Sequence, residues 1–167
     1  MSAVETKQKA VHMQEAGIQG ELSIDWKQLM ARKNAFTEPF PAMMEGSLKS
    51  SGLVTLHGEA SFQEDESLKV GDELYTADNY LIATGQKPLI PQIPGKEYFK
   101  TSNDFLALEE MPASMVFLGT GFVALELAQI AAAAGSQVTV IARHQLKVNG
   151  FDQELALDFI DQIAKMA

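Results

Sequence analysis

The first fifty residues place apolar side chains at helical spacing. Residues 1–20 predict one helix that ends near Gly17. Residues 23–48 predict another, in which Trp26, Leu29 and Met30 follow at i, i+3 and i+4. Two prolines in the second segment should kink or split it, because proline lacks the amide hydrogen that a helix interior needs. These prolines are Pro39 and Pro41.

The pattern then changes to short apolar stretches. Residues 53–62, 67–70 and 74–77 predict three strands. The Gly71-Asp72 dipeptide suits a tight turn, so these strands are expected to form an antiparallel β-meander. Residues 80–83 are apolar throughout and predict a further strand, buried on both faces.

A proline-rich stretch separates this region from the last third of the chain. Residues 86–112 predict a linker between two domains, interrupted by a short helix over residues 104–108. Helices and central strands are disfavoured there, because Pro88, Pro91 and Pro94 cannot donate backbone hydrogen bonds.

The last third has the pattern of a strand, a helix and a second strand. Residues 115–118 predict a buried strand, residues 122–134 an alanine-rich helix that Gly135 ends, and residues 137–142 the second strand. This order, completed within about thirty residues, predicts a right-handed βαβ unit and an α/β fold class. A last helix is expected over residues 152–164.

Composition narrows the class of protein. With 167 residues the chain can form one domain or two small ones. Hydrophobic residues make up 46%, which predicts a packed core. A net charge of −9 argues against nucleic acid and anionic membranes as partners. The longest apolar stretch is too short and polar to cross a bilayer, and no apolar signal core opens the chain, so we expect a cytoplasmic protein.

Cysteine and histidine usage excludes several chemistries. The chain has no cysteine, so disulfides, thiolate nucleophiles and zinc–thiolate sites are excluded within it. His12, His57 and His144 are far apart, and none forms a pair with metal-ligand spacing. We therefore expect no metal site.

The strongest chemical signal is the turn Gly119-Thr120-Gly121-Phe122-Val123-Ala124, which reads G-x-G-x-x-A between the predicted strand and helix. Gly119 allows a tight turn, Gly121 leaves room for a pyrophosphate beside the backbone, and Ala124 lets the helix approach the strand. The free N–H groups of the first helical turn then attract the phosphates of a dinucleotide. The alternative is a βα turn that uses its glycines for geometry alone.

The end of the second strand indicates which dinucleotide is bound. A site for NAD usually has an acidic residue there, about 20 residues past the turn, which accepts a hydrogen bond from the ribose 2′-hydroxyl. Here Arg143 and His144 follow Ala142, and an arginine pairs with a 2′-phosphate. This favours NADP(H). The alternative is a solvated Arg-His pair at a strand end.

Glu126 lies on the same predicted helix as the turn, five residues after Gly121. A charged residue on a helix is ordinarily a solvent-facing carboxylate. The residues alone assign it no other role.

Together these segments resemble the pyridine nucleotide-disulfide oxidoreductases, and most nearly the branch of glutathione reductase and mercuric reductase. The resemblance covers nearly the whole chain and depends on several motifs in one order. These are Ala83-Thr84-Gly85, Ile93-Pro94-Gly95, Thr101-Ser102-Asn103-Asp104-Phe105, the run from Gly119 to Ala128, and the tail from Arg143 to Asp152.

The resemblance implies roles for individual residues. Ala83, Thr84 and Gly85 match the segment that meets the ADP portion of the flavin, so FAD is implied as a cofactor of the full-length family. The run 119–124 matches the phosphate turn of the nicotinamide cofactor. Phe122 matches an aromatic residue that can lie over the flavin until NADPH displaces it. Glu126 matches a glutamate that pairs with a lysine beside the flavin.

The resemblance also bears on the choice of dinucleotide. Arg143 and His144 match the clamp for the 2′-phosphate. A second arginine of that clamp is expected near position 149, where this chain has Asn149. The departure weakens the NADP(H) prediction without reversing it.

Other departures concern the whole chain. No G-x-G-x-x-G turn precedes residue 80, and the redox-active cysteine pair of the family is absent. We therefore expect an internal piece of a longer chain: a Rossmann-like fold with a β-meander in which both nucleotide-binding domains are incomplete. Residues 1–110 would be a partial FAD-binding domain, and residues 111–167 a partial NAD(P)-binding domain.

Three functions remain open. The first is a fragment of an FAD-dependent NAD(P)H oxidoreductase that acts on a disulfide or similar acceptor and is inactive alone. The second is a stand-alone NADP(H)-binding module without catalysis, and the third a subunit that a separate chain completes. Strands without neighbours expose apolar edges, so we expect self-association or a dimer.

Overall fold

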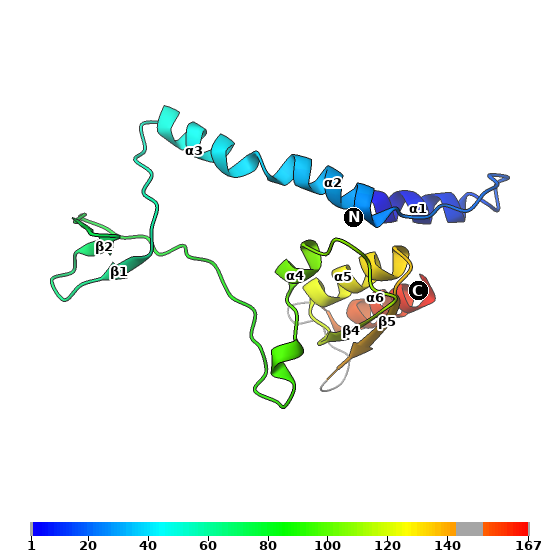
Figure 1. Ribbon diagram of the computed structural model, residues 1–167. Helices are drawn as coiled ribbons and strands as arrows, with labels where there is room; N and C mark the ends of the chain where they lie inside the picture. Colours follow the sequence, from blue (N-terminus) through cyan, green and yellow to red (C-terminus); the bar gives the residue numbers. More distant parts are fainter. Residues whose placement is uncertain (1, 143–151, 167) are drawn as a thin grey trace. The chain divides into compact units, whose positions relative to one another are not determined.

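The computed structural model describes residues 2–142 and 152–166 (Figure 1). The chain divides into two compact units. The first combines Met1–Lys33 with Pro94–Ala167, and the second is Asn34–Ile93. Each is described by itself. The domain boundary near residue 110 stays a prediction.

The first unit contains the predicted βαβ arrangement. β4 (Ser114–Leu118) and β5 (Gln137–Ile141) pair in parallel, and α5 (Phe122–Ala133) connects them. Val116 lies opposite Thr139 in the register. The prediction from the alternation of apolar segments is confirmed to within one or two residues at each boundary.

The two strands are covered on one face only. Met115 and Phe117 of β4 point into the core, whereas Val116 and Leu118 are 65% and 49% exposed. The prediction of a fully buried strand is therefore wrong. Among the described residues, α5 and its neighbours cover only one side of the sheet, so β4 alternates between core and solvent.

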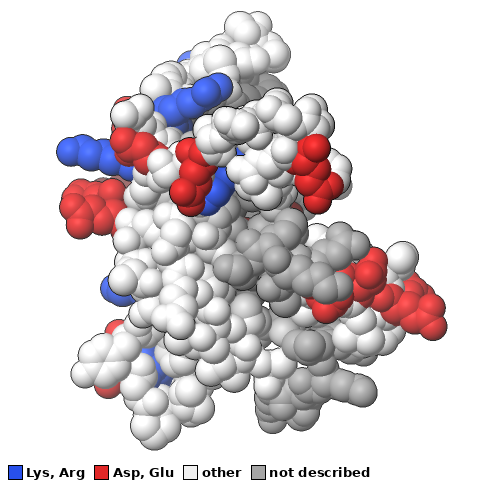
Figure 2. Space-filling model, turned by 90° about the vertical axis from the view of Figure 1, so that its right-hand side faces the viewer, with Lys and Arg blue, Asp and Glu red and all other residues white. Residues whose placement is uncertain are grey.

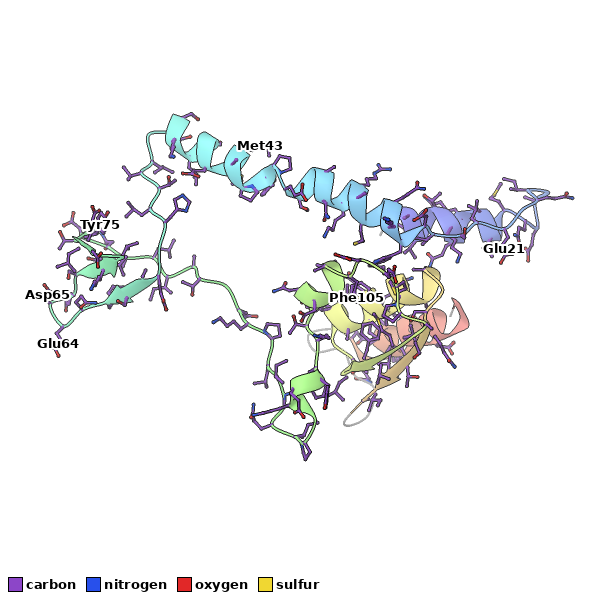
Figure 3. All side chains as sticks on the ribbon, viewed as in Figure 1. Glu21, Met43, Glu64, Asp65, Tyr75 and Phe105 are labelled. Carbon is purple, nitrogen blue, oxygen red and sulfur yellow. The ribbon has the colours of Figure 1, made fainter. Side chains whose placement is uncertain are left out.

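The core of this unit forms around an aromatic pair. Trp26, Phe105 and Ala131 are its buried members. Phe105, on α4 (Ser102–Leu106), is labelled in Figure 3. Partly buried apolar side chains from the helices and both strands pack against this group. They are Leu29, Met30, Leu108, Met111, Met115, Phe117, Leu127, Ile130, Ala134 and Val138.

The remaining helices of the first unit follow the predicted order. α1 (Ser2–His12) is shorter than predicted, because turn bonds such as that from the N–H of Ala16 to the carbonyl of Met13 follow it. α2 (Trp26–Thr37) directly follows Asp25, whose Oδ1 accepts the N–H of Gln28 at 3.0 Å. The other two elements are η1 (Lys96–Tyr98) and α6 (Gln153–Met166), which packs on α5.

The second unit contains the split helix and the β-meander. α3 (Phe40–Ser50) begins after Pro39, so the prolines divide the helical segment as predicted. β1 (Ala60–Phe62), β2 (Leu68–Val70) and β3 (Glu73–Tyr75) pair antiparallel in that order. The predicted meander is confirmed.

Two strand predictions in the second unit are wrong. The strand predicted over residues 53–62 is limited to β1, and residues 80–83 form no strand. Leu81 and Ile82 are 94% and 71% exposed. An apolar run forms a buried strand only where neighbouring strands pair with it, and no described strand pairs with residues 80–83.

One carboxylate ties α3 to the extended segment that follows it. Oε1 of Glu45 accepts hydrogen bonds from Nζ of Lys49 at 2.6 Å and Oγ1 of Thr55 at 3.0 Å, and lies 3.2 Å from Nε2 of His57. The Lys49 bond, then the His57 and Thr55 bonds, lower the pKa of Glu45 from 4.5 to about 2. Thr55 and His57 reach the same group because side chains two positions apart share one side of an extended chain.

We predict that acid releases this attachment. The folded-state pKa of Glu45 is depressed, so its contribution is present above pH 4.5 and is lost as the pH falls through about 2. An NMR titration of the Glu45 carboxyl carbon should give a midpoint near 2, and Glu45→Gln should abolish the acid transition at Thr55. A midpoint at the ordinary value of 4.5 would contradict the contacts.

Candidate functional site

The G-x-G-x-x-A turn lies between the end of β4 and the start of α5. Gly119 has a φ of 108°, a conformation that side chains other than glycine rarely adopt. Its N–H donates to the carbonyl of Ile141 at 2.8 Å, which ties the turn to β5. Gly121 is the N-cap of α5, with extended backbone angles of −68° and 159°. The first helical bond runs from the N–H of Leu125 to the Gly121 carbonyl at 3.1 Å.

The N-terminus of α5 is open. Its N-cap residue, Gly121, makes no side-chain cap bond, although serine, threonine or aspartate commonly do so at this position. A Cβ placed on Gly119 or Gly121 would meet no atom of the described residues within 4 Å. Packing among the described residues therefore does not require a glycine at position 121. The N–H groups of residues 122–124 precede the first helical bond and have no acceptor within the helix.

The side chains around the turn are accessible. Phe122 and Val123 are 59% and 42% exposed. Ala124 is partly buried, and Leu125 is 2% exposed against α6. The small residue at position 124 thus lies on the first turn of the helix, next to its first core residue. Glu126 is exposed, as expected for a helical carboxylate, and its pairing with a lysine stays a prediction.

The other expected site residues are placed differently. Arg143 and His144 lie outside the described residues. Ala83, Thr84 and Gly85 are exposed and belong to the second unit, where they form no strand or helix. The residues of the G-x-G-x-x-A turn lie together within the first unit.

A contact at the other end of α5 was not expected from the sequence. Nζ of Lys7, on α1, donates to the carbonyl of Ala133 at 2.7 Å. A cation at a helix C-terminus is favourable, since the last carbonyls lack helical donors. The two residues are 126 positions apart, so no local pattern indicates the contact.

Residues 2–142 and 152–166 bring together no group of three acidic or histidine side chains that could hold a metal ion. No described helix combines the length and hydropathy that crossing a membrane requires. Figure 2 shows acidic and basic side chains interleaved on one face.

Comparison with known proteins decides the family. The family model described as pyridine nucleotide-disulphide oxidoreductase matches residues 6–166. The chain belongs to this family. Among curated members, it is 30% identical over 136 residues to glutathione reductase from Nostoc sp., and 35% identical over 129 residues to the chloroplastic/mitochondrial glutathione reductase of Pisum sativum. These matches cover 81% and 77% of the chain.

Solved structures support the same fold. The HOCl-induced flavoprotein disulfide reductase RclA from Escherichia coli matches 98% of the chain in its Cu(II) complex, with a TM-score of 0.78 and 23% identity. A second structure of that protein gives a TM-score of 0.76 at 22% identity. The chain spans 30% and 23% of the two curated relatives and 35% of the first structure. Its fold is accordingly a partial α/β flavoprotein reductase fold with incomplete sheets.

We predict that the two glycines of the turn respond oppositely to the same substitution. Gly121→Ser should leave the free energy of unfolding unchanged or raise it by a few tenths of a kcal/mol, because serine is a good N-cap and the space is open. Gly119→Ser should lower it by about 1–3 kcal/mol, because of the positive φ. Urea denaturation followed by circular dichroism measures both. Equal effects would contradict the observed turn geometry.

Proposed function

We propose that the turn between β4 and α5 binds the pyrophosphate of a nicotinamide dinucleotide. The observation that supports this most directly is the open helix N-terminus. Gly121 provides an approach to uncapped N–H groups, and the helix dipole favours an anion there. The family to which the chain belongs uses such cofactors.

We propose NADP(H) rather than NAD(H) as the preferred dinucleotide. The support comes from the sequence after β5, where Arg143 and His144 take the place of the acidic residue of an NAD site. Asn149 supplies no second cation. The preference should therefore be smaller than for a clamp with two arginines.

Flavin binding is proposed for full-length members rather than for these 167 residues alone. Residues 83–85 are exposed and belong to no strand or helix, so by themselves they do not fit the ADP portion of FAD. When bound, the flavin would accept hydride from the nicotinamide and pass electrons onward. No step within this chain is assigned to it.

The corresponding biological activity is reduction of a disulfide or similar acceptor by NADPH in a longer protein. The chain has no cysteine and cannot itself exchange a disulfide. We propose that it is inactive alone and that it self-associates through the exposed face of β4 and β5, where Val116, Leu118 and Ile141 are accessible. A cytoplasmic location stays a prediction.

A stand-alone dinucleotide-binding module is the second candidate. The first unit favours it, because β4, α5 and β5 share one core with α2 and α4, and the phosphate turn lies within that unit. This module would bind NADP(H) without flavin or turnover.

Calorimetric titration with NADP⁺ and NAD⁺ tests the proposal. We expect micromolar binding of NADP⁺, weaker binding of NAD⁺, and a loss of about tenfold or more in Gly121→Ser. The serine hydroxyl would occupy amides that otherwise bind phosphate, and hydrogen bonds to charged groups contribute about 1.5–3 kcal/mol each. Arg143→Ala should reduce NADP⁺ affinity and leave NAD⁺ affinity unchanged.

Two results would contradict the proposal. Absence of NADP⁺ binding to the wild-type chain would refute the phosphate site. Flavin absorbance in the purified chain with NADPH-dependent disulfide reduction would refute inactivity. Binding without flavin would favour the module over an inert fragment.

A further inference from the structure

The phosphate turn is positioned by what holds β4. The turn begins at Gly119, directly after the last residue of β4. Within residues 2–142 and 152–166, β4 pairs with β5 alone, and its side chains in the core are those of Met115 and Phe117. The side chains that fix Phe117 therefore also fix the start of the turn, two residues further on.

Contacts between aromatic rings connect Phe117 on β4, through Phe105 on α4, to Trp26 on α2. The ring of Phe117 lies 6.2 Å from that of Phe105 at an angle of 55°. The ring of Phe105 lies 5.7 Å from that of Trp26, edge to face at 75°. Phe105 and Trp26 are 6% and 7% exposed, so both contacts are shielded from water. Buried aromatic pairs of this geometry restrict each other's position beyond simple burial.

Trp26 is itself held in place by α4 and the residues after it. Its Nε1 donates to the carbonyl of Leu108 at 2.8 Å. Lys33, two turns further along α2, donates from Nζ to the carbonyl of Leu106 at 2.7 Å. Both acceptors lie at or just after the C-terminus of α4, where carbonyls lack helical donors. These two bonds link α2 to the C-terminal end of α4, the helix that carries Phe105.

We propose that Trp26 is a positioning residue for dinucleotide binding. It acts through Phe105 and Phe117 to hold β4, and hence the turn at Gly119, in the conformation that presents the helix amides. The proposal rests on the proposed function of the turn. It adds that Trp26, more than ninety positions before Gly119 in the sequence, contributes to affinity without contacting the ligand.

Amide hydrogen exchange tests the positioning without any ligand. The Gly119 amide is the probe, because its bond to the Ile141 carbonyl reports the start of the turn. Trp26→Phe keeps a ring and loses the Leu108 bond. We expect it to increase the exchange rate of the Gly119 amide, by a factor about two to ten times larger than the increase for amides in α6. Phe105→Leu removes the ring between Trp26 and Phe117 and should also increase exchange at Gly119. It replaces Trp26→Phe in the test if that variant folds poorly.

Val4→Ala is the matched control. Val4 is 2% exposed on α1, which contacts α5 and no other described element. This variant should lower global stability without favouring exchange at Gly119. If Val4→Ala and Trp26→Phe increase the exchange rate at Gly119 equally, the effect comes from lower global stability alone, and the proposal is overturned.

NADP⁺ titration by calorimetry completes the test. Trp26→Phe should bind about two- to tenfold more weakly than wild type at equal folded fraction, and Val4→Ala should bind as wild type does. If the wild-type chain binds NADP⁺ and Trp26→Phe binds it with the same affinity, this inference is overturned and the proposed function is left intact. If the wild-type chain binds no NADP⁺, the proposed function fails, and with it the role of Trp26 in affinity.

Discussion

The backbone N–H groups in the first turn of α5 have no carbonyl within the helix to donate to, and the N-cap residue Gly121 provides no side-chain cap. Proteins commonly satisfy such groups with a serine or aspartate. Among the described residues, no atom fills the space where a Cβ of residue 121 would lie. The positive φ of Gly119 directs the backbone from β4 into this arrangement. The proposed function depends on this local constraint more than on any charged side chain that the structure describes.

The rest of the first unit holds that turn in place from one side. α5 packs on β4 and β5 over a small aromatic core, and α1 contacts its far end through Lys7. The opposite face of the sheet has Val116 exposed. Few contacts among the described residues stabilise this unit. The loss of individual contacts, such as those of Trp26, should therefore have measurable effects on the turn.

The sequence predicted best where structure depends on nearby residues. The βαβ unit, the helix break at Pro39 and the meander all follow from local periodicity, proline or turn chemistry, and they are confirmed. Residues 80–83 were predicted wrongly because apolar character alone does not provide partner strands. The aromatic contact between Trp26 and Phe105 joins positions 79 residues apart, which no local pattern indicates. The G-x-G-x-x-A turn could be located from its glycines, whereas its backbone conformation and its described surroundings required coordinates.

The central claim is that the amides at the start of α5 bind the phosphates, and NMR of the ¹⁵N-labelled chain measures this residue by residue. Titration with ADP-ribose, which carries the pyrophosphate without the nicotinamide, should shift the amide resonances of residues 119–124 most and saturate them together. Unchanged resonances in that segment, with ADP-ribose bound elsewhere or not at all, would contradict the account.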